Sequence, residues 1–214
     1  MTIQRIKNRN VVFSHRDLPE WDLHLSVILG HKHVFLIDTG LGSESVKPII
    51  SFLEPFNKPL IVINTHYHWD HVWGNGSVGN VPVIAHETSR TLLTEKWDGD
   101  MEKNKRYVRG QADKVFPNQL FDKRLYFPDD GVLLFHTPGH TPDGISILDE
   151  KEGVLHIGDT IGDTPDAPVP DLDLSADIYR RTLINCLSLS FDTVISGHNQ
   201  IQDKPFIEKI LTLI

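Results

Sequence analysis

The segment THYHWDH at residues 65–71 concentrates side chains that can bind transition metals. It holds the histidines His66, His68 and His71 and the carboxylate Asp70. In an extended segment, residues i and i+2 point the same way, so His66 and His68 can hold one ion while Asp70 and His71 face a second. Imidazole nitrogens suit Zn²⁺ and Fe²⁺, and carboxylates suit the same ions. The spacing therefore predicts a metal site that needs further ligands from elsewhere in the chain.

Three more candidate ligands each follow an apolar run that is typical of a strand. His140 stands in TPGHTPD, Asp159 in HIGDT and His198 in SGHN. Open α/β sheets bind ligands at the carboxyl ends of their strands, so these residues are expected to converge on the histidine cluster. The seven candidates divide into two half-sites that Asp159 can bridge, one of His66, His68 and His140 and one of Asp70, His71 and His198. Seven protein ligands around two ions leave positions open for water, as in catalytic sites.

Such a pair of ions would support hydrolysis. Metal binding lowers the pKa of water to about 7, and the resulting hydroxide, held between the ions, can attack an ester, thioester or lactone bond. Asp70 and Asp159 are the candidate catalytic residues, because either carboxylate could shuttle the proton. Two Zn²⁺ per chain are the expected cofactors, with Fe²⁺ or Mn²⁺ as alternatives.

Short apolar runs and helical patterns alternate along the chain. Strands are predicted within 24–40 (two strands), 59–66, 81–87, 131–140, 144–150, 153–160 and 192–198. Helices are predicted within 43–56, 87–113, 175–191 and 205–214. Ser43 or Ser45 is the expected cap of the first helix and Ser175 of the third, and Pro205 begins the last.

The second half of the chain echoes the first. HVFLIDTG and VLHIGDT both run from a strand through an aspartate into a turn, and each leads through a helix to an apolar strand that ends in histidine, VINTH and VISGH. Two βαβ-containing halves packed sheet against sheet, with helices outside, predict an α/β fold of four layers, the αββα sandwich. Residues 1–214 are expected to form a single domain, because this length can bury one good core.

The motif set THYHWDH, GH, GD and SGH, in this order, resembles the metallo-β-lactamase superfamily from about residue 25 to residue 198. The resemblance implies the αββα fold and the ligand division given above. It also implies that Asp38 of LIDTG supports the ligand histidines. In carrying an aspartate at position 159, the chain resembles the glyoxalase II, homoserine-lactone lactonase and ribonuclease Z branches of the superfamily. The true β-lactamases often carry a cysteine there or lack a bridging carboxylate.

The chain departs from these branches beyond Asp159. The segment GDTPDAPVPDLDLSAD at 162–177 is acidic and rich in proline, so it would repel an anionic substrate such as a glutathione derivative. The tyrosine that the lactonases carry just after the bridging aspartate is missing, since Ile161 and Gly162 fill that stretch. Tyr179 is a substitute only if it is not a core or surface residue. The choice among ester, thioester and lactone stays open.

Other residues near the motifs have both a functional and a structural interpretation. Four aromatic residues could form an apolar wall for the substrate or could simply pack in the core: Trp21, Tyr67, Trp69 and Trp73. The charged segment 95–111 could be a lid or a solvated helix face. His86 could approach the metal site, and Cys186 is expected to be a small core residue.

Composition restricts the partners. The 21 Lys and Arg against 29 Asp and Glu give a net charge of −8, which argues against a nucleic acid or an anionic membrane held by electrostatics. No run of 18 apolar residues predicts a membrane span, and no signal peptide is visible. A small-molecule substrate and a cytoplasmic location are therefore expected, with the oligomeric state left open.

Two rival functions remain from the sequence. Iron persulfide dioxygenases share the fold and ligand set that the resemblance implies, but use one Fe²⁺ on two histidines and an aspartate. A non-catalytic metal-binding protein on the same scaffold is the second rival, although such relatives usually lose ligands.

Overall fold

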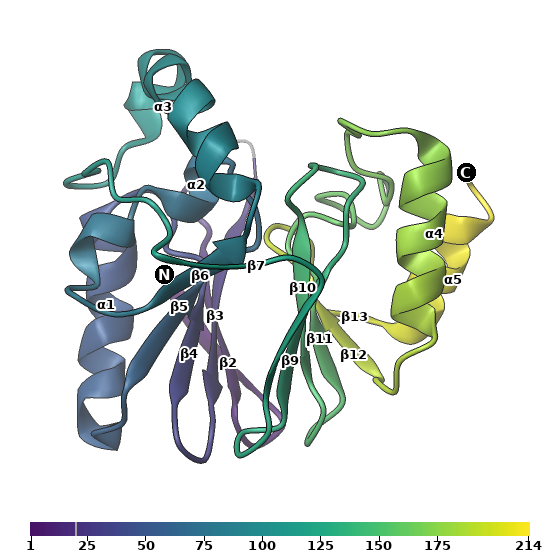
Figure 1. The fold of residues 1–214 in the computed structure, drawn as a ribbon, viewed down its shortest axis with the longest axis horizontal. Coiled ribbons are helices and arrows are strands. Elements are labelled where there is room, and N and C mark those ends of the chain that lie inside the picture. The colour runs from purple at the N-terminus through teal and green to yellow at the C-terminus, as the bar shows by residue number, and fades with distance from the viewer. Residues whose placement is uncertain (20) are drawn as a thin grey trace.

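The computed structural model, which describes residues 1–19 and 21–214, consists of two β-sheets stacked face to face between helices (Figure 1). The first sheet has the order β1-β2-β3-β4-β5-β6-β7, formed by Thr2–Ile6, Asn10–His15, Leu23–Leu29, Val34–Ile37, Leu60–Ile63, Val83–His86 and Gln119–Phe121. The second has the order β13-β12-β11-β10-β9-β8; in chain order, β8 to β13 are Arg124–Phe127, Val132–His136, Ile145–Asp149, Val154–His156, Thr193–Ile195 and Gln202–Asp203.

Helices cover the outer face of each sheet, which confirms the predicted four-layer αββα arrangement. The helices α1 (Ser43–Leu53), α2 (Trp69–Val72) and α3 (Ser89–Asn104) lie on the side of the first sheet, and α4 (Ala176–Leu187) and α5 (Lys204–Leu211) lie on the second (Figure 1). Short 3₁₀ turns at Glu54–Phe56, Asn75–Ser77 and Lys105–Tyr107 follow α1, α2 and α3. Within the described part of the chain, no helix is both long and apolar enough to span a membrane.

The central strands are buried on both faces, as their unbroken apolar runs predict. Successive side chains of a strand point to opposite faces. In β4, Leu36 therefore belongs to the buried cluster that contains Ile49 of α1, whereas its neighbour Phe35 belongs to the cluster between the sheets that contains Leu134 of β9. On the other side of the second sheet, Cys186 of α4 is fully buried, as expected, and burial raises the pKa of its thiol to about 12.

The two similar halves predicted from the sequence correspond to two βαβ units. Strands β4 and β5 pair in parallel across helix α1, and strands β11 and β12 pair in parallel across helix α4. Because parallel strands end at the same edge of a sheet, the segment after β4 emerges beside the segment after β5, and the segment after β11 beside the segment after β12. These are the segments that carry most of the candidate ligands.

Two parts of the local prediction differ from the structure. Strands β1, β2, β7, β8 and β13 were not anticipated. Neither Ser43 nor Ser45 caps α1, because Gly42 occupies that position. Instead, the Ser43 hydroxyl accepts a hydrogen bond from the backbone N–H of Gln111 at 2.9 Å. Ser175 does precede α4, but its side chain makes no capping bond there.

A buried ion pair joins the two sheets at the edge opposite the candidate site. Arg9, in the turn between β1 and β2, donates from Nε to Asp149 Oδ2 at the end of β10 at 2.8 Å, and Asn10 donates to the same oxygen at 2.8 Å. The Asp149 side chain is fully buried. Burial opposes its charge, but the hydrogen bonds from Arg9 and Asn10 hold the pKa of Asp149 below its ordinary value.

Replacing Arg9 with alanine should therefore destabilise the fold by about 3 kcal/mol, because it leaves a buried carboxylate without its cation. Urea unfolding at pH 7 measures this. A depressed carboxyl pKa contributes stability above the unfolded pKa of about 4 that is lost as pH falls through the folded pKa. The variant should consequently lose less stability than the wild type on acidification to pH 3. Lys123→Ala, at a side chain that is 86% exposed, should change stability by no more than about 0.5 kcal/mol.

Candidate metal centre

The seven candidate ligands all lie in segments that leave strands at one edge of the two sheets. His66 and His68 follow β5, and Asp70 and His71 belong to the short helix α2 directly after them. The other three come from the second sheet: His140 follows β9, Asp159 follows β11 and His198 follows β12. The structure thus brings together all seven residues that the sequence singled out.

The carboxylate of Asp159 is the centre of the cluster. Its Oδ2 lies 3.2 Å from Nε2 of His71 and 3.2 Å from Nε2 of His198. The same oxygen lies 3.6 Å from Nε2 of His66 and 3.8 Å from Nε2 of His140. One carboxylate oxygen therefore faces four imidazole nitrogens.

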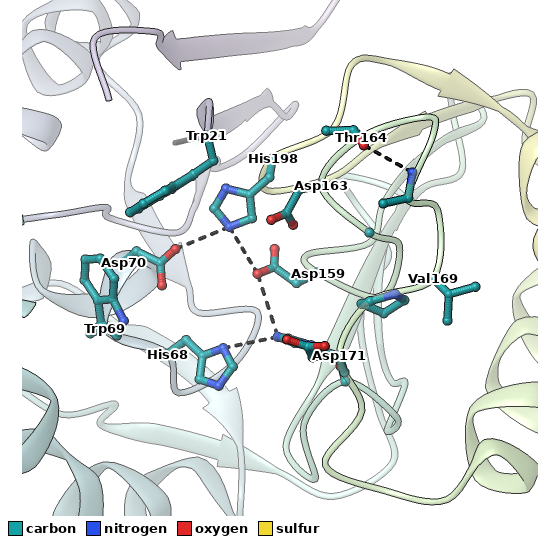
Figure 2. Close-up of a pocket in the computed structure, with 14 residues that line it drawn as sticks. Trp21, His68, Trp69, Asp70, Asp159, Asp163, Thr164, Val169, Asp171 and His198 are labelled. Atoms are coloured by element: carbon teal, nitrogen blue, oxygen red, sulfur yellow. Dashed lines mark hydrogen bonds and ion pairs between the residues drawn. The ribbon is translucent and has the colours of Figure 1, made fainter. Parts of the chain in front are cut away.

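The ligand atoms gather in two groups. In each group the atoms that could hold a metal ion lie within 4.8 Å of one another; the first group is His66, His68, His140 and Asp159, and the second is Asp70, His71 and His198. Oδ2 of Asp70 is 3.3 Å from Nε2 of His198. Figure 2 shows His68, Asp70, Asp159 and His198 turned toward a common cavity. Because Asp159 also approaches His71 and His198, it lies between the groups.

Hydrogen bonds to oxygen acceptors fix which nitrogen three of the rings present. Nδ1 of His71 lies 2.8 Å from Oδ2 of Asp38. Nδ1 of His198 donates to the Asp22 carbonyl at 2.8 Å, and Nδ1 of His140 donates to the Asp171 carbonyl at 2.7 Å. Because a carbonyl or carboxylate oxygen only accepts, Nδ1 of each ring carries a proton, and Nε2 is the nitrogen that faces the centre. This is the arrangement that a metal-ligating histidine needs.

Asp38 orients two of the histidines at once. It accepts from the Thr65 backbone N–H at 2.7 Å and from the Thr65 hydroxyl at 2.8 Å, besides its bond from His71. Since that hydroxyl gives its proton to Asp38, it accepts from Nδ1 of His66 at 3.0 Å, which leaves Nε2 of His66 unprotonated. Asp38 is buried and has φ 60°, a left-handed conformation that few aspartates adopt.

The buried donor atoms fit a divalent cation. Among the described ligand residues, Nε2 of His66, Nε2 of His71 and Oδ1 of Asp159 are buried and have no hydrogen-bond partner, a costly state for polar atoms unless an ion satisfies them. Burial, with the neighbouring His71, holds the pKa of His66 well below its usual value. Burial alone would raise the pKa of Asp159, but His198 and His71 hold it well below the ordinary range. Asp159 in turn raises the pKa of His71 and His198 well above its usual value, although burial opposes this. A divalent cation would take the place of these protons, since neutral imidazoles and ionised carboxylates are the forms that bind Zn²⁺ and related ions.

Gly197 is a site residue that the sequence motifs did not single out. A Cβ at this position would collide with Oδ1 of Asp159 and would lie 2.7 Å from Cε1 of His71. The backbone of Gly197 therefore approaches the ligands more closely than any side chain would allow. Only the SGH spacing hinted at this role, because it places the glycine directly before His198.

A cavity of about 500 Å³ opens over the centre. Trp21 and Trp69 form one wall, and segment 162–171 forms another. Tyr107 supports the tryptophans from outside the cavity, with ring centroids 5.0 Å from Trp21 and 5.4 Å from Trp69. Two of the four aromatic residues expected near the site therefore line it.

The other residues with two interpretations have structural contacts. Trp73 is buried and packs edge-on against Trp97 of α3, with ring centroids 6.5 Å apart. No residue of the charged segment 95–111 is among the described residues that line the cavity. Tyr179 is fully buried and donates to the Thr160 carbonyl at 2.8 Å. His86 stacks on His136 with centroids 3.9 Å apart, away from the centre.

Comparison with known proteins identifies the family whose sequences this chain matches. The family model of the metallo-beta-lactamase superfamily matches residues 20–198. An N-acyl homoserine lactonase of Bacillus sp is 32% identical over 95 residues, which are 44% of this chain and 34% of that protein. An acyl-coenzyme A thioesterase of Homo sapiens is 25% identical over 161 residues (64% and 57%), and a hydroxyacylglutathione hydrolase of Pelagibacter ubique is 28% identical over 122 residues (56% and 44%). The chain thus aligns with only part of each relative's length.

Solved structures confirm the fold. A metallo-beta-lactamase from Hirschia baltica superposes with a TM-score of 0.77 at 16% identity, over 99% of this chain and 96% of that one. A metallo-beta-lactamase from Pontibacter korlensis gives a TM-score of 0.74 at 17% identity, over 99% and 97%. At this identity the likeness concerns architecture alone.

Gly197→Ala should sharply reduce metal binding while keeping the fold, because the added methyl group displaces Asp159 and His71. Elemental analysis of the purified variant should give less than half of the wild-type metal content, with circular dichroism as the check on folding. Gly99→Ala is the matched control, since a Cβ at Gly99 in α3 meets nothing within 4 Å. Equal metal content in the Gly197 variant and the wild type would contradict this account of the residue.

Asp38→Asn should weaken zinc binding about 10- to 100-fold, the usual effect of removing a hydrogen-bond partner of a ligand histidine. Asparagine keeps the size and tolerates the left-handed backbone, but it replaces one acceptor oxygen with a donor. Competition with a chromophoric chelator measures the dissociation constant. Asp98→Asn, at a side chain that is 85% exposed, should bind zinc like the wild type, and an unchanged constant in the Asp38 variant would refute the positioning role.

Proposed function

The chain belongs to the metallo-β-lactamase superfamily, and on that premise we propose that it is a metal-dependent hydrolase acting on an ester, thioester or lactone bond. The position of Asp159 carries the proposal. Its Oδ2 faces the Nε2 atoms of His71 and His198 at 3.2 Å each and, more distantly, those of His66 and His140. A carboxylate in this position is suited to bridge two ions.

The proposed ligand set follows the two groups of donor atoms. His66, His68 and His140 would hold one ion, Asp70, His71 and His198 would hold the other, and Asp159 would bridge them. Two zinc ions are proposed because the nitrogen and oxygen donors suit Zn²⁺, with Fe²⁺ or Mn²⁺ as alternatives. When bound, such ions polarise a carbonyl oxygen and lower the pKa of water to about 7.

The two carboxylates have distinct proposed tasks. Both Asp70 and Asp159 line the cavity, so each can meet the attacking water. Asp70 lies at the end of the cluster, with Oδ2 3.6 Å from Nε2 of His71 and 3.3 Å from Nε2 of His198. From there it can accept the proton of the attacking water and return it to the leaving group. Asp159 holds the centre together and is the second candidate for this transfer.

The relatives support cleavage next to an acyl carbonyl. Their names describe a lactonase, a thioesterase and a hydroxyacylglutathione hydrolase, and the cavity of about 500 Å³ is of a size that holds a small molecule. The family match over residues 20–198 further supports a single domain over 1–214. We accordingly propose a small molecule as the partner of this site.

Metal content per chain, measured on protein purified without chelator or added metal, tests the proposal first. About two equivalents of zinc, together with turnover of a panel of esters, thioesters and lactones, are expected. About one equivalent of iron with oxygen consumption on sulfur substrates would instead indicate a persulfide dioxygenase. Metal without turnover of any substrate would indicate a binding protein.

Asp159→Ala and His140→Ala should each abolish turnover and reduce the metal content, because each removes a ligand from the proposed centre. Hydrolysis by the two variants is compared with that of His31→Ala, an exposed histidine outside the cluster. Wild-type rates in either ligand variant would refute the assignment.

A further inference from the structure

The cavity over the metal centre is lined by aspartates but, among the described residues, by no lysine or arginine. Its described lining residues include four aspartates, Asp70, Asp159, Asp163 and Asp171, and no lysine or arginine. Asp70 and Asp159 belong to the proposed metal centre. Asp163 and Asp171 therefore remain as the acidic side chains that line the cavity outside the proposed centre.

Hydrogen bonds hold this acidic segment against both halves of the centre. The Gly162 carbonyl accepts from Nδ2 of Asn199 at 2.6 Å, beside His198. The Asp171 carbonyl accepts from Nδ1 of His140 at 2.7 Å. The carboxylates of Asp163 and Asp171 are consequently presented by a fixed segment, and in the described part of the chain neither forms an ion pair that would neutralise it.

The opposite wall is aromatic. Figure 2 shows Trp21 and Trp69 on the side facing Asp163 and Asp171. The two indoles contact each other edge-on with centroids 6.0 Å apart, and Trp21 also approaches the His198 ring edge-on at 6.4 Å. Indole faces attract apolar groups and, through their quadrupole, cations.

These two walls would sort substrates by charge. An ester or thioester that carries a carboxylate or phosphate away from its reacting carbonyl would bring that anion near Asp163 or Asp171 without meeting a lysine or arginine. The resulting repulsion lowers affinity. An apolar group would pack on Trp21 and Trp69, and a cationic group would gain from both walls.

We infer that this cavity selects acyl substrates whose non-reacting part is apolar and either uncharged or cationic, with Asp163 and Asp171 as the residues that exclude anions. The inference rests on the proposed hydrolase function and narrows its substrate class. Thioesters of glutathione and coenzyme A, which are anionic, would be poor substrates for this chain, although two of its relatives are named for them. Neutral esters and lactones fit best.

Three phenyl acetates of similar shape test the inference: the unsubstituted ester, the 4-carboxylate and the 4-trimethylammonium. Each kcat/KM is divided by the rate of alkaline hydrolysis of the same ester, which removes the electronic effect of the substituent. The wild type should favour the cationic over the anionic ester by about tenfold or more, the scale of a charge–charge interaction near a protein surface. In the double variant Asp163→Asn, Asp171→Asn that preference should fall about tenfold.

Asp166→Asn is the matched control. Asp166 lies on the same segment and is exposed, but it is not among the residues that line the cavity. This variant removes one negative charge from the same loop, so it should keep the wild-type preference. Metal content is measured for every variant, so that a change in occupancy is not taken for a change in selectivity.

A binding measurement separates this inference from the proposed function. Benzohydroxamates with the same three substituents chelate metals without being esters, and quenching of the tryptophan fluorescence, to which Trp21 and Trp69 contribute, reports their binding to the metal-loaded protein. If no ester is cleaved but the hydroxamates bind in the order cationic, neutral, anionic, the hydrolase proposal fails and the charge selection stands. The inference is overturned if the anionic ester or hydroxamate performs as well as the neutral one, or if the double variant keeps the wild-type preference.

Discussion

The structure depends on one crowded electrostatic contact, the Asp159 carboxylate facing four imidazole Nε2 atoms within 3.2 to 3.8 Å. Three of these rings already use Nδ1 as a donor to an oxygen acceptor, so Nε2 is the nitrogen that faces the carboxylate. The carboxylate raises the pKa of His71 and His198 well above its usual value, so positive charge is favoured here, and divalent cations can take the place of the protons. A site of this kind is built for metal ions, and the rest of the fold holds it together.

The scaffold meets this requirement through the ends of its strands and a few residues behind the ligands. Two parallel βαβ units bring segments from both sheets to one edge, and Asp38 in a left-handed conformation holds His71 directly and His66 through Thr65. Gly197 allows the backbone to pass against the ligands. Precision at the centre thus comes from hydrogen bonds and close packing around it.

The walls of the cavity beyond the ligands carry the side chains that a substrate would meet next to the metal centre. Two solved structures that share its fold have 16–17% identity to it, a level at which the likeness concerns the layers alone. Here one wall is aromatic and the other carries Asp163 and Asp171. One scaffold can serve different substrates when the side chains around a common site differ.

The sequence by itself determined the four-layer class and the seven candidate ligands, because buried strands have unbroken apolar runs and metal-binding residue types at their ends are rare by chance. It did not predict β1, whose exposed residues carry no apolar pattern, or the replacement of the expected serine cap by Gly42. Only the tertiary structure decided that Trp21 lines the cavity while Trp73 lies in the core. It also decided that the Asp22 and Asp171 carbonyls orient two ligands and that position 197 has no room for a side chain. These features depend on contacts between segments distant in the chain, which local patterns do not encode.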